Sequence, residues 1–152
     1  MTRKEASEEV KKWKAFIDAS PFKLTVRSMF LTEDGDITEY EMKGAWINEC
    51  EFVYTGIFGV GIYFRKSPLN GNKIKRTIIS RGVEHRLDGP AVVKCAYEYF
   101  KIYGVNGNKN DPFNMTKWCV EGRQMTFSDW SSLKEVKNAM CLKMIAGVID
   151  EA

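Results

Sequence analysis

The sequence predicts a single α+β domain, a twisted antiparallel sheet of β-hairpins with an N-terminal and a C-terminal helix. Two observations predict it. Apolar residues recur at helical spacing near both ends, and between them apolar segments alternate and are separated by turn-forming residues. A length of 152 residues suits one domain with its own core. The expected parts of domain 1–152 are a helix at 1–20, a β-hairpin region at 22–122 and a helix at 126–147.

The N-terminal segment is expected to form a helix that covers one side of the sheet. Thr2 followed by Glu5 is typical of a capping box, and Pro21 ends the helical segment. A basic amphipathic helix that binds a membrane or nucleic acid is the alternative, but interspersed carboxylates favour packing on the sheet. The apolar face comprises Val10, Trp13, Phe16 and Ile17.

Two turns are expected to divide the β region into hairpins. Asp34-Gly35 lies between two apolar segments, which is a strong hairpin signal because glycine adopts positive φ at little cost. Residues 67–73 are also rich in turn formers and should close a second hairpin, with its return strand at 74–80. Residues 56–64 are predicted to form a glycine-spaced strand rather than a phosphate-binding loop.

A loose repeat runs through the hairpin region: a large apolar residue, three further residues, then glycine. We expect each glycine to supply an unusual backbone conformation at a turn, with the large side chain on a buried face. The last three of the five instances are the better ones, because their flanking residues also agree. The instances are Tyr40 with Gly44, Phe52 with Gly56, Ile78 with Gly82, Tyr103 with Gly107, and Trp118 with Gly122.

After Gly122 the turn is expected to give way directly to the C-terminal helix. Thr126 and Asp129 approximate a capping box, and apolar residues follow at helical spacing. Gly147 is predicted to end this helix. Methionines at 140 and 144 are typical of core filling.

The clearest motif is His85-Arg86-Leu87-Asp88-Gly89-Pro90-Ala91. It resembles the H-R-x-D-G-P-A repeat of small, mostly uncharacterised bacteriophage proteins, and it is distantly similar to MORN-like β-hairpin repeats. In that group a W-x-x-x-G segment precedes each copy, and the last copy often leads into a Thr-capped helix. Residues 118–130 are similar to that ending. The resemblance covers residues 74–133 and implies a phage-like origin and a stack of hairpins, with no established activity.

The motif also permits a catalytic interpretation. A histidine with a carboxylate three residues away would serve as the base of a small hydrolase-like enzyme acting through His85 and Asp88. No serine or cysteine lies in a recognisable nucleophile motif, so a structural turn is favoured. In that turn Asp88 bonds the backbone, and His85 and Arg86 brace the neighbouring repeat. The turn residues are His85, Arg86, Asp88, Gly89 and Pro90.

No cofactor and no metal are expected. The chain has one histidine and four dispersed cysteines, which lack the ligand spacing of a zinc site. The carboxylates at 33, 34 and 36 lack the register of a calcium loop. The first residues lack the apolar core of a signal peptide and no apolar segment approaches the length of a membrane span, so we expect cytoplasmic location, in the host cell if the protein is phage-encoded.

Two groups of side chains are candidates for binding a partner. Basic residues flank the second predicted hairpin, and tyrosines in the next segment would stack on bases or pack in the core. The candidates are Arg65, Lys66, Lys73, Lys75, Arg76, Tyr97 and Tyr99. The net charge of +3 alone does not indicate a polyanion binder. We expect a non-enzymatic phage-type protein that binds and modulates a host protein, such as an enzyme or defence factor, with inhibition as the expected form. Nucleic-acid binding is the alternative, and the oligomeric state stays open.

Overall fold

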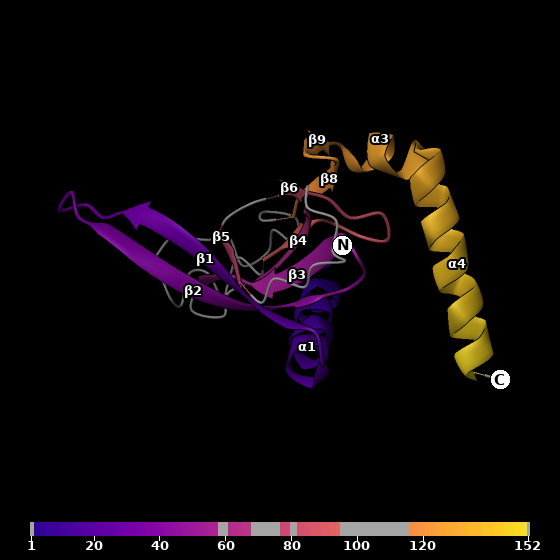
Figure 1. The fold of residues 1–152 in the computed structure, drawn as a ribbon. Coiled ribbons are helices and arrows are strands. Elements are labelled where there is room, and N and C mark those ends of the chain that lie inside the picture. Colours follow the sequence, from indigo (N-terminus) through magenta and orange to yellow (C-terminus); the bar gives the residue numbers. More distant parts are fainter. Residues whose placement is uncertain (1, 58–60, 68–76, 80–81, 95–115, 152) are drawn as a thin grey trace.

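The protein has an α+β fold in which the N-terminal helix packs on a sheet of hairpin strands and the C-terminal helices lie to one side of it (Figure 1). The predicted fold class is confirmed. The computed structural model describes residues 2–57, 61–67, 77–79, 82–94 and 116–151. The helices are α1 (Arg3–Ala19), α3 (Phe127–Ser132) and α4 (Lys134–Glu151). The strands are β1 (Lys23–Leu31), β2 (Ile37–Trp46), β3 (Glu51–Thr55), β4 (Ile62–Lys66), β5 (Thr77–Ile79), β6 (Val83–Glu84), β7 (Val92–Val93), β8 (Trp118–Val120) and β9 (Arg123–Met125).

The main sheet is built around an antiparallel meander of β1 to β4. Its strand order is β5-β1-β2-β3-β4-β6, and β7 also pairs with β4. The first predicted hairpin is confirmed: Leu31 lies opposite Ile37, and Gly35 adopts a φ of +82° in the turn. The Thr32 hydroxyl accepts a hydrogen bond from the backbone N–H of Asp36 at 3.2 Å, which closes the loop.

The second predicted hairpin is wrong in its pairing. β5, which falls in the predicted return strand 74–80, pairs in parallel with β1, with Thr25 opposite Thr77. The described antiparallel partners of β4 are β3, β6 and β7. Turn-forming residues indicate where a chain reverses, but they do not specify which sheet edge the next strand joins.

Two of the glycine predictions are also wrong. Residues 56–64 are not one strand, because β3 ends at Thr55 and Gly61, with a φ of +70°, precedes β4. Gly44 lies inside β2 rather than at a turn. A Cβ there would meet the Val53 carbonyl oxygen at 2.7 Å, so this glycine permits close packing within the sheet.

The two faces of the sheet carry separate buried clusters. On one face, α1 covers a buried cluster that includes Ala45, Val53 and Phe64. This confirms that the N-terminal helix packs on the sheet: Ala6, Val10, Trp13 and Ile17 are buried, and Phe16 lies at the exposed margin. The other face buries an aromatic and aliphatic cluster of Leu24, Val26, Met42, Trp46, Phe52 and Tyr54.

A small hairpin, β8–β9, joins the sheet to the C-terminal helices. Glu121 and Gly122 form its turn with φ values of +52° and +82°. The backbone N–H of Gly122 donates to the carbonyl of Glu84 at 2.9 Å, which ties the turn to β6. The return strand β9 was not predicted, since the helix was expected to follow Gly122 directly.

The predicted helix at 126–147 is two helices. Thr126 caps α3 as expected, because its hydroxyl accepts from the Asp129 N–H at 3.1 Å. Leu133 then adopts an extended conformation. The Ser132 hydroxyl donates to the Ser128 carbonyl at 2.6 Å, which competes with continuation of the helix. α4 continues past Gly147 to Glu151, so the predicted end at Gly147 is wrong.

Candidate functional site

The motif at 85–91 folds around the buried guanidinium of Arg86, whose exposed fraction is 3%. Its Nε donates to Asp88 Oδ1 at 2.8 Å, and its Nη1 donates to the Pro90 carbonyl at 3.2 Å. Its Nη2 makes an ion pair with Glu9 on α1. The guanidinium also lies over the Phe64 ring, 4.1 Å from its centroid. Arg86 therefore connects the motif to α1 and to the sheet.

Two neighbours fix the position of this arginine. A Cβ at Gly89 would lie 2.5 Å from Arg86 Cζ, so only glycine leaves room for the guanidinium. The Trp130 indole N–H donates to the Arg86 carbonyl at 3.0 Å, which attaches α3 to the same residue. Gly89 thus leaves space for the guanidinium, and Trp130 provides a hydrogen bond to the motif.

The side chain of His85 bridges two segments. Its Nδ1 accepts a hydrogen bond from the Glu121 N–H at 3.0 Å, and its Nε2 lies 3.3 Å from Glu51 Oε1. A nitrogen that accepts a backbone N–H bond carries no proton, so the neutral ring holds its proton at Nε2. Both nitrogens are therefore engaged with the protein, and His85 braces the β8–β9 turn.

The carboxylates that contact Arg86 and His85 are held in their charged form. Burial raises the pKa of Glu9 and of Asp88, but the charge and hydrogen bond of Arg86 outweigh it and leave both pKa values below their ordinary range. The hydrogen bond from His85 lowers the pKa of Glu51 despite partial burial. Asp88 bonds the Arg86 side chain, so His85 and Asp88 act on separate partners.

A cavity of about 560 Å³ lies beside the motif, between the sheet and α4. Its described lining contains His85, Arg86 and Asp88 together with apolar side chains such as Phe52 and Leu142. Among these residues there is no serine, threonine or cysteine that could serve as a nucleophile. The cavity therefore places His85 and Asp88 along one lining, where each already contacts another group of its own chain.

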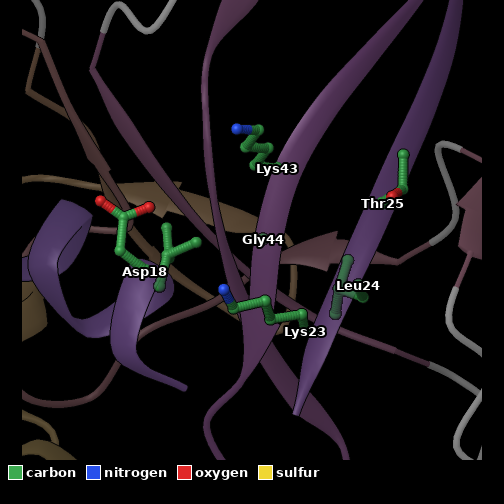
Figure 2. Close-up of a pocket in the computed structure, with 7 residues that line it drawn as sticks. Asp18, Lys23, Leu24, Thr25, Lys43 and Gly44 are labelled. Carbon is green, nitrogen blue, oxygen red and sulfur yellow. The ribbon is translucent and has the colours of Figure 1, made fainter. Parts of the chain in front are cut away.

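A second hollow, of about 360 Å³, lies where the end of α1 meets the β1–β2 hairpin. Figure 2 shows Lys23 and Lys43 reaching out on the side of the hairpin where Asp18 lies. Both lysines are exposed, so their ammonium groups keep their water. The hollow consequently has no buried charge that a bound anion would neutralise.

The predicted basic surface is only partly within the described residues. Lys66 forms an ion pair with Glu121, and the Arg65 guanidinium lies 5.6 Å from the centroid of the Tyr54 ring. Both cations thus contact groups of their own chain. Five of the predicted binding residues, Lys73, Lys75, Arg76, Tyr97 and Tyr99, lie outside the described residues.

Among the described side chains of the sheet, the most exposed apolar ones lie at the far end of the β1–β2 hairpin. Met29, Leu31 and Ile37 are between 67% and 75% exposed. Leu31 lies directly opposite Ile37, and Met29 precedes Leu31 by two residues, so all three share one face. We call these three side chains the hairpin-end patch. In Figure 1 this end of the hairpin extends beyond the other strands.

Carboxylates surround the hairpin-end patch. Residues 27–41 contain one arginine and five acidic residues, a net charge of −4 in a chain whose net charge is +3. On the same face, Arg27 pairs with Glu41 at 3.1 Å and lies 3.6 Å from Glu39. The patch could not be predicted from the sequence, because alternation predicts a strand but not how far its neighbours cover it. The long alternating segments on both sides of Asp34-Gly35 were the available signal.

The remaining chemistry of the described residues is sparse. They contain no group of three or more histidine, cysteine or acidic side chains that could hold a metal ion. None of their helices combines the length and apolarity needed to cross a membrane. The chain matches no protein-family model, no curated protein and no solved structure.

Proposed function

We propose that this chain is a non-enzymatic, phage-type protein that binds a host protein through the hairpin-end patch and thereby inhibits it. The observation that supports this function is the cluster of Met29, Leu31 and Ile37 on one face of an extended hairpin. Single exposed apolar residues are common on protein surfaces, whereas neighbouring ones on a projecting element are typical of interaction sites. Burying three such side chains would contribute about 3–6 kcal/mol to binding.

The charge around the patch defines the expected partner. A net charge of −4 over residues 27–41 favours a protein surface with an apolar centre and basic residues around it. The same charge opposes contact with nucleic-acid phosphates at this site. The contacts of His85 and Asp88 with their own chain support the non-enzymatic part of the proposal.

The experiment is affinity capture from bacterial lysate with the wild-type protein and with Leu31→Asp. We expect the wild type to retain one stoichiometric protein, and the variant to lose it, because a carboxylate in the centre of the contact would be buried without a partner. The matched control is Leu142→Asp on α4, a leucine that is 68% exposed against 75% for Leu31, and this variant should retain the protein.

Two further measurements test the charge and the inhibition. Reversing Glu39 and Glu41 to lysine should slow association and reduce its dependence on salt, since the acidic residues attract the partner. The activity of the captured protein should fall when the wild type is added and not when Leu31→Asp is added. Equal retention by wild type and Leu31→Asp would rule out the hairpin-end patch as the binding site.

A further inference from the structure

The helix α4 forms one wall of the cavity of about 560 Å³ that lies beside the motif. Ala139, Leu142 and Lys143 line the cavity from this helix. Leu142 is nevertheless 68% exposed, so the cavity is open to solvent beside α4. Met144 is outside the lining and 71% exposed, and Met140 lies at the margin. The predicted core role of the two methionines is therefore wrong for Met144.

The cavity has the size and the apolar base of a small-molecule site. Its volume falls within the range of about 300–1,000 Å³ that is typical of ligand pockets. The rings of Trp13, Phe52 and Phe64 line it from α1 and the sheet, and all three are buried. Buried aromatic rings offer a large apolar surface to a flat ligand. The open side next to Leu142 gives such a ligand a way in.

The two carboxylates of the lining already bond to their own chain. Asp88 Oδ1 accepts a hydrogen bond from Arg86 Nε at 2.8 Å. Glu51 Oε2 accepts from Asn48 Nδ2 at 3.0 Å, and Glu51 Oε1 lies 3.3 Å from the protonated Nε2 of His85. The Arg86 guanidinium is likewise used up by its three partners in the chain. These groups satisfy one another and need no ligand.

Two cations of the same lining lack such partners. Among the side chains that the structure describes, no carboxylate lies within 4.0 Å of the charged groups of Arg65 or Lys143. The Nε of Arg65 is buried and has no hydrogen-bond partner, although the guanidinium lies near the Tyr54 ring. Lys143 bonds only a neutral group, the backbone carbonyl of Asp88. A buried N–H without an acceptor is costly, and a ligand oxygen would remove that cost.

We propose that this cavity binds a small organic anion with an apolar body, such as an aryl-substituted carboxylate. The anionic group accepts a hydrogen bond from Arg65 Nε, and Lys143 attracts it at the open side. The apolar body packs on the buried rings at the base. A cationic ligand would be repelled by both side chains, and a purely apolar one would leave the Arg65 donor without an acceptor. The site does not involve the hairpin-end patch.

The test is an NMR titration of the full chain with phenylpropanoate, a probe that combines one carboxylate with one ring. We expect saturable binding with a Kd of about 1 mM, as is usual for so small a ligand. The indole N–H signal of Trp13, which lines the cavity, should shift, and that of Trp118, which does not, should stay. Phenylpropanol keeps the ring without the charge and should bind about tenfold more weakly. Acetate keeps the charge without the ring and should cause no shift.

Removing each cation tests the charge of the ligand. Arg65→Met should weaken phenylpropanoate binding about tenfold, because a charged hydrogen-bond donor is lost, and should leave phenylpropanol binding unchanged. Lys143→Met should weaken phenylpropanoate binding about threefold, as expected for an exposed charge. The control Lys134→Met removes an exposed lysine of the same helix that does not line the cavity, and it should bind like the wild type.

Filling the cavity tests the location. Ala139→Phe places a ring in the lining and should abolish the binding of both phenyl probes. Ala146→Phe makes the same change at an exposed position of α4 outside the lining and should retain it. Far-UV circular dichroism checks that each variant is folded.

Three results would overturn the proposal. The first is a titration in which phenylpropanoate shifts no signal, since the cavity then holds only water. The second is equal affinity for phenylpropanoate and phenylpropanol, or for wild type and Arg65→Met. The third is undiminished binding by folded Ala139→Phe. All of these results are independent of host-protein capture by the hairpin-end patch.

Discussion

Replacing Gly89 by alanine tests whether the motif at 85–91 exists to bury the Arg86 guanidinium. The added methyl group would lie 2.5 Å from Cζ and 2.7 Å from Nη1, closer than such atoms can approach. The φ of Gly89 is not in the positive region, so backbone strain contributes nothing. The guanidinium is buried and held by three partners, and it cannot move aside without breaking hydrogen bonds.

The expected destabilisation is large. Breaking a buried ion pair while its charges stay in the protein costs about 3–5 kcal/mol. We therefore expect Gly89→Ala to lower the free energy of unfolding by about 3–5 kcal/mol in urea titrations followed by tryptophan fluorescence. Gly147→Ala is the matched control. Nothing lies within 4 Å of a Cβ at Gly147, which is inside α4, so this change should stabilise the protein by about 0.5–1 kcal/mol.

A double-mutant cycle isolates the cause. In an Arg86→Met background the guanidinium is absent, and Gly89→Ala should then cost less than about 1 kcal/mol. The reasoning would be refuted if Gly89→Ala in the wild-type background cost less than about 1 kcal/mol. It would also be refuted if the cost were the same with and without Arg86.

Three further outcomes follow from the contacts around the motif. Burial raises the pKa of Glu9, but Arg86 outweighs burial and holds this pKa below its ordinary value of 4.5. The Glu9–Arg86 ion pair therefore stabilises the fold above pH 4.5, and this stabilisation is lost on further acidification. Acid unfolding should thus be less steep in Glu9→Gln, and an unchanged pH profile would contradict the ion pair. Trp130→Phe leaves the Arg86 carbonyl without its hydrogen-bond donor and should lower the free energy of unfolding by about 1–3 kcal/mol in urea titrations. An unchanged free energy of unfolding would show that water replaces the indole. Burial and the Glu84 carboxylate raise the pKa of the Cys119 thiol to about 12. Mass spectrometry of the folded protein treated with iodoacetamide should therefore find Cys119 unmodified and the exposed Cys141 modified. Equal labelling of the two thiols would show that Cys119 is accessible.

The local features of the fold were predictable from sequence because short-range chemistry determines them. Thr2 caps α1, with the Glu5 N–H donating to its hydroxyl at 3.1 Å, and the Asp34-Gly35 turn closes the first hairpin. The apolar spacing of α1 identified its buried side. Each of these depends on residues within a few positions of one another.

The long-range features were not predictable. The parallel pairing of β5 with β1 joins residues about fifty positions apart, and no local pattern identifies that partner. The same holds for the ion pair of Arg86 with Glu9, which links the motif to the N-terminal helix. The sequence indicated that the motif was structural, but the reason for its arginine and Gly89 appears only once α1 and α3 are in place.

The exposed apolar side chains show a different limit of prediction from sequence. Alternation along β1 predicts a strand with one apolar face, and helical spacing in α4 predicts an amphipathic helix. Neither pattern distinguishes an apolar side chain buried in the protein's own core from one available to a partner. Leu31 and Ile145 have ordinary core-like patterns in the sequence and are exposed in the structure.

The contacts of Arg86 also determine when the chain can complete its core during synthesis. Glu9 is synthesised first, its cation Arg86 follows 77 residues later, and the Trp130 indole that binds the Arg86 carbonyl follows after another 44. Contacts so distant in sequence form slowly, because long loops must close before they are made. The nascent protein must therefore hold α1 and the β1–β4 meander in an incomplete state until Trp130 emerges, and premature termination before Trp130 would leave that state permanent.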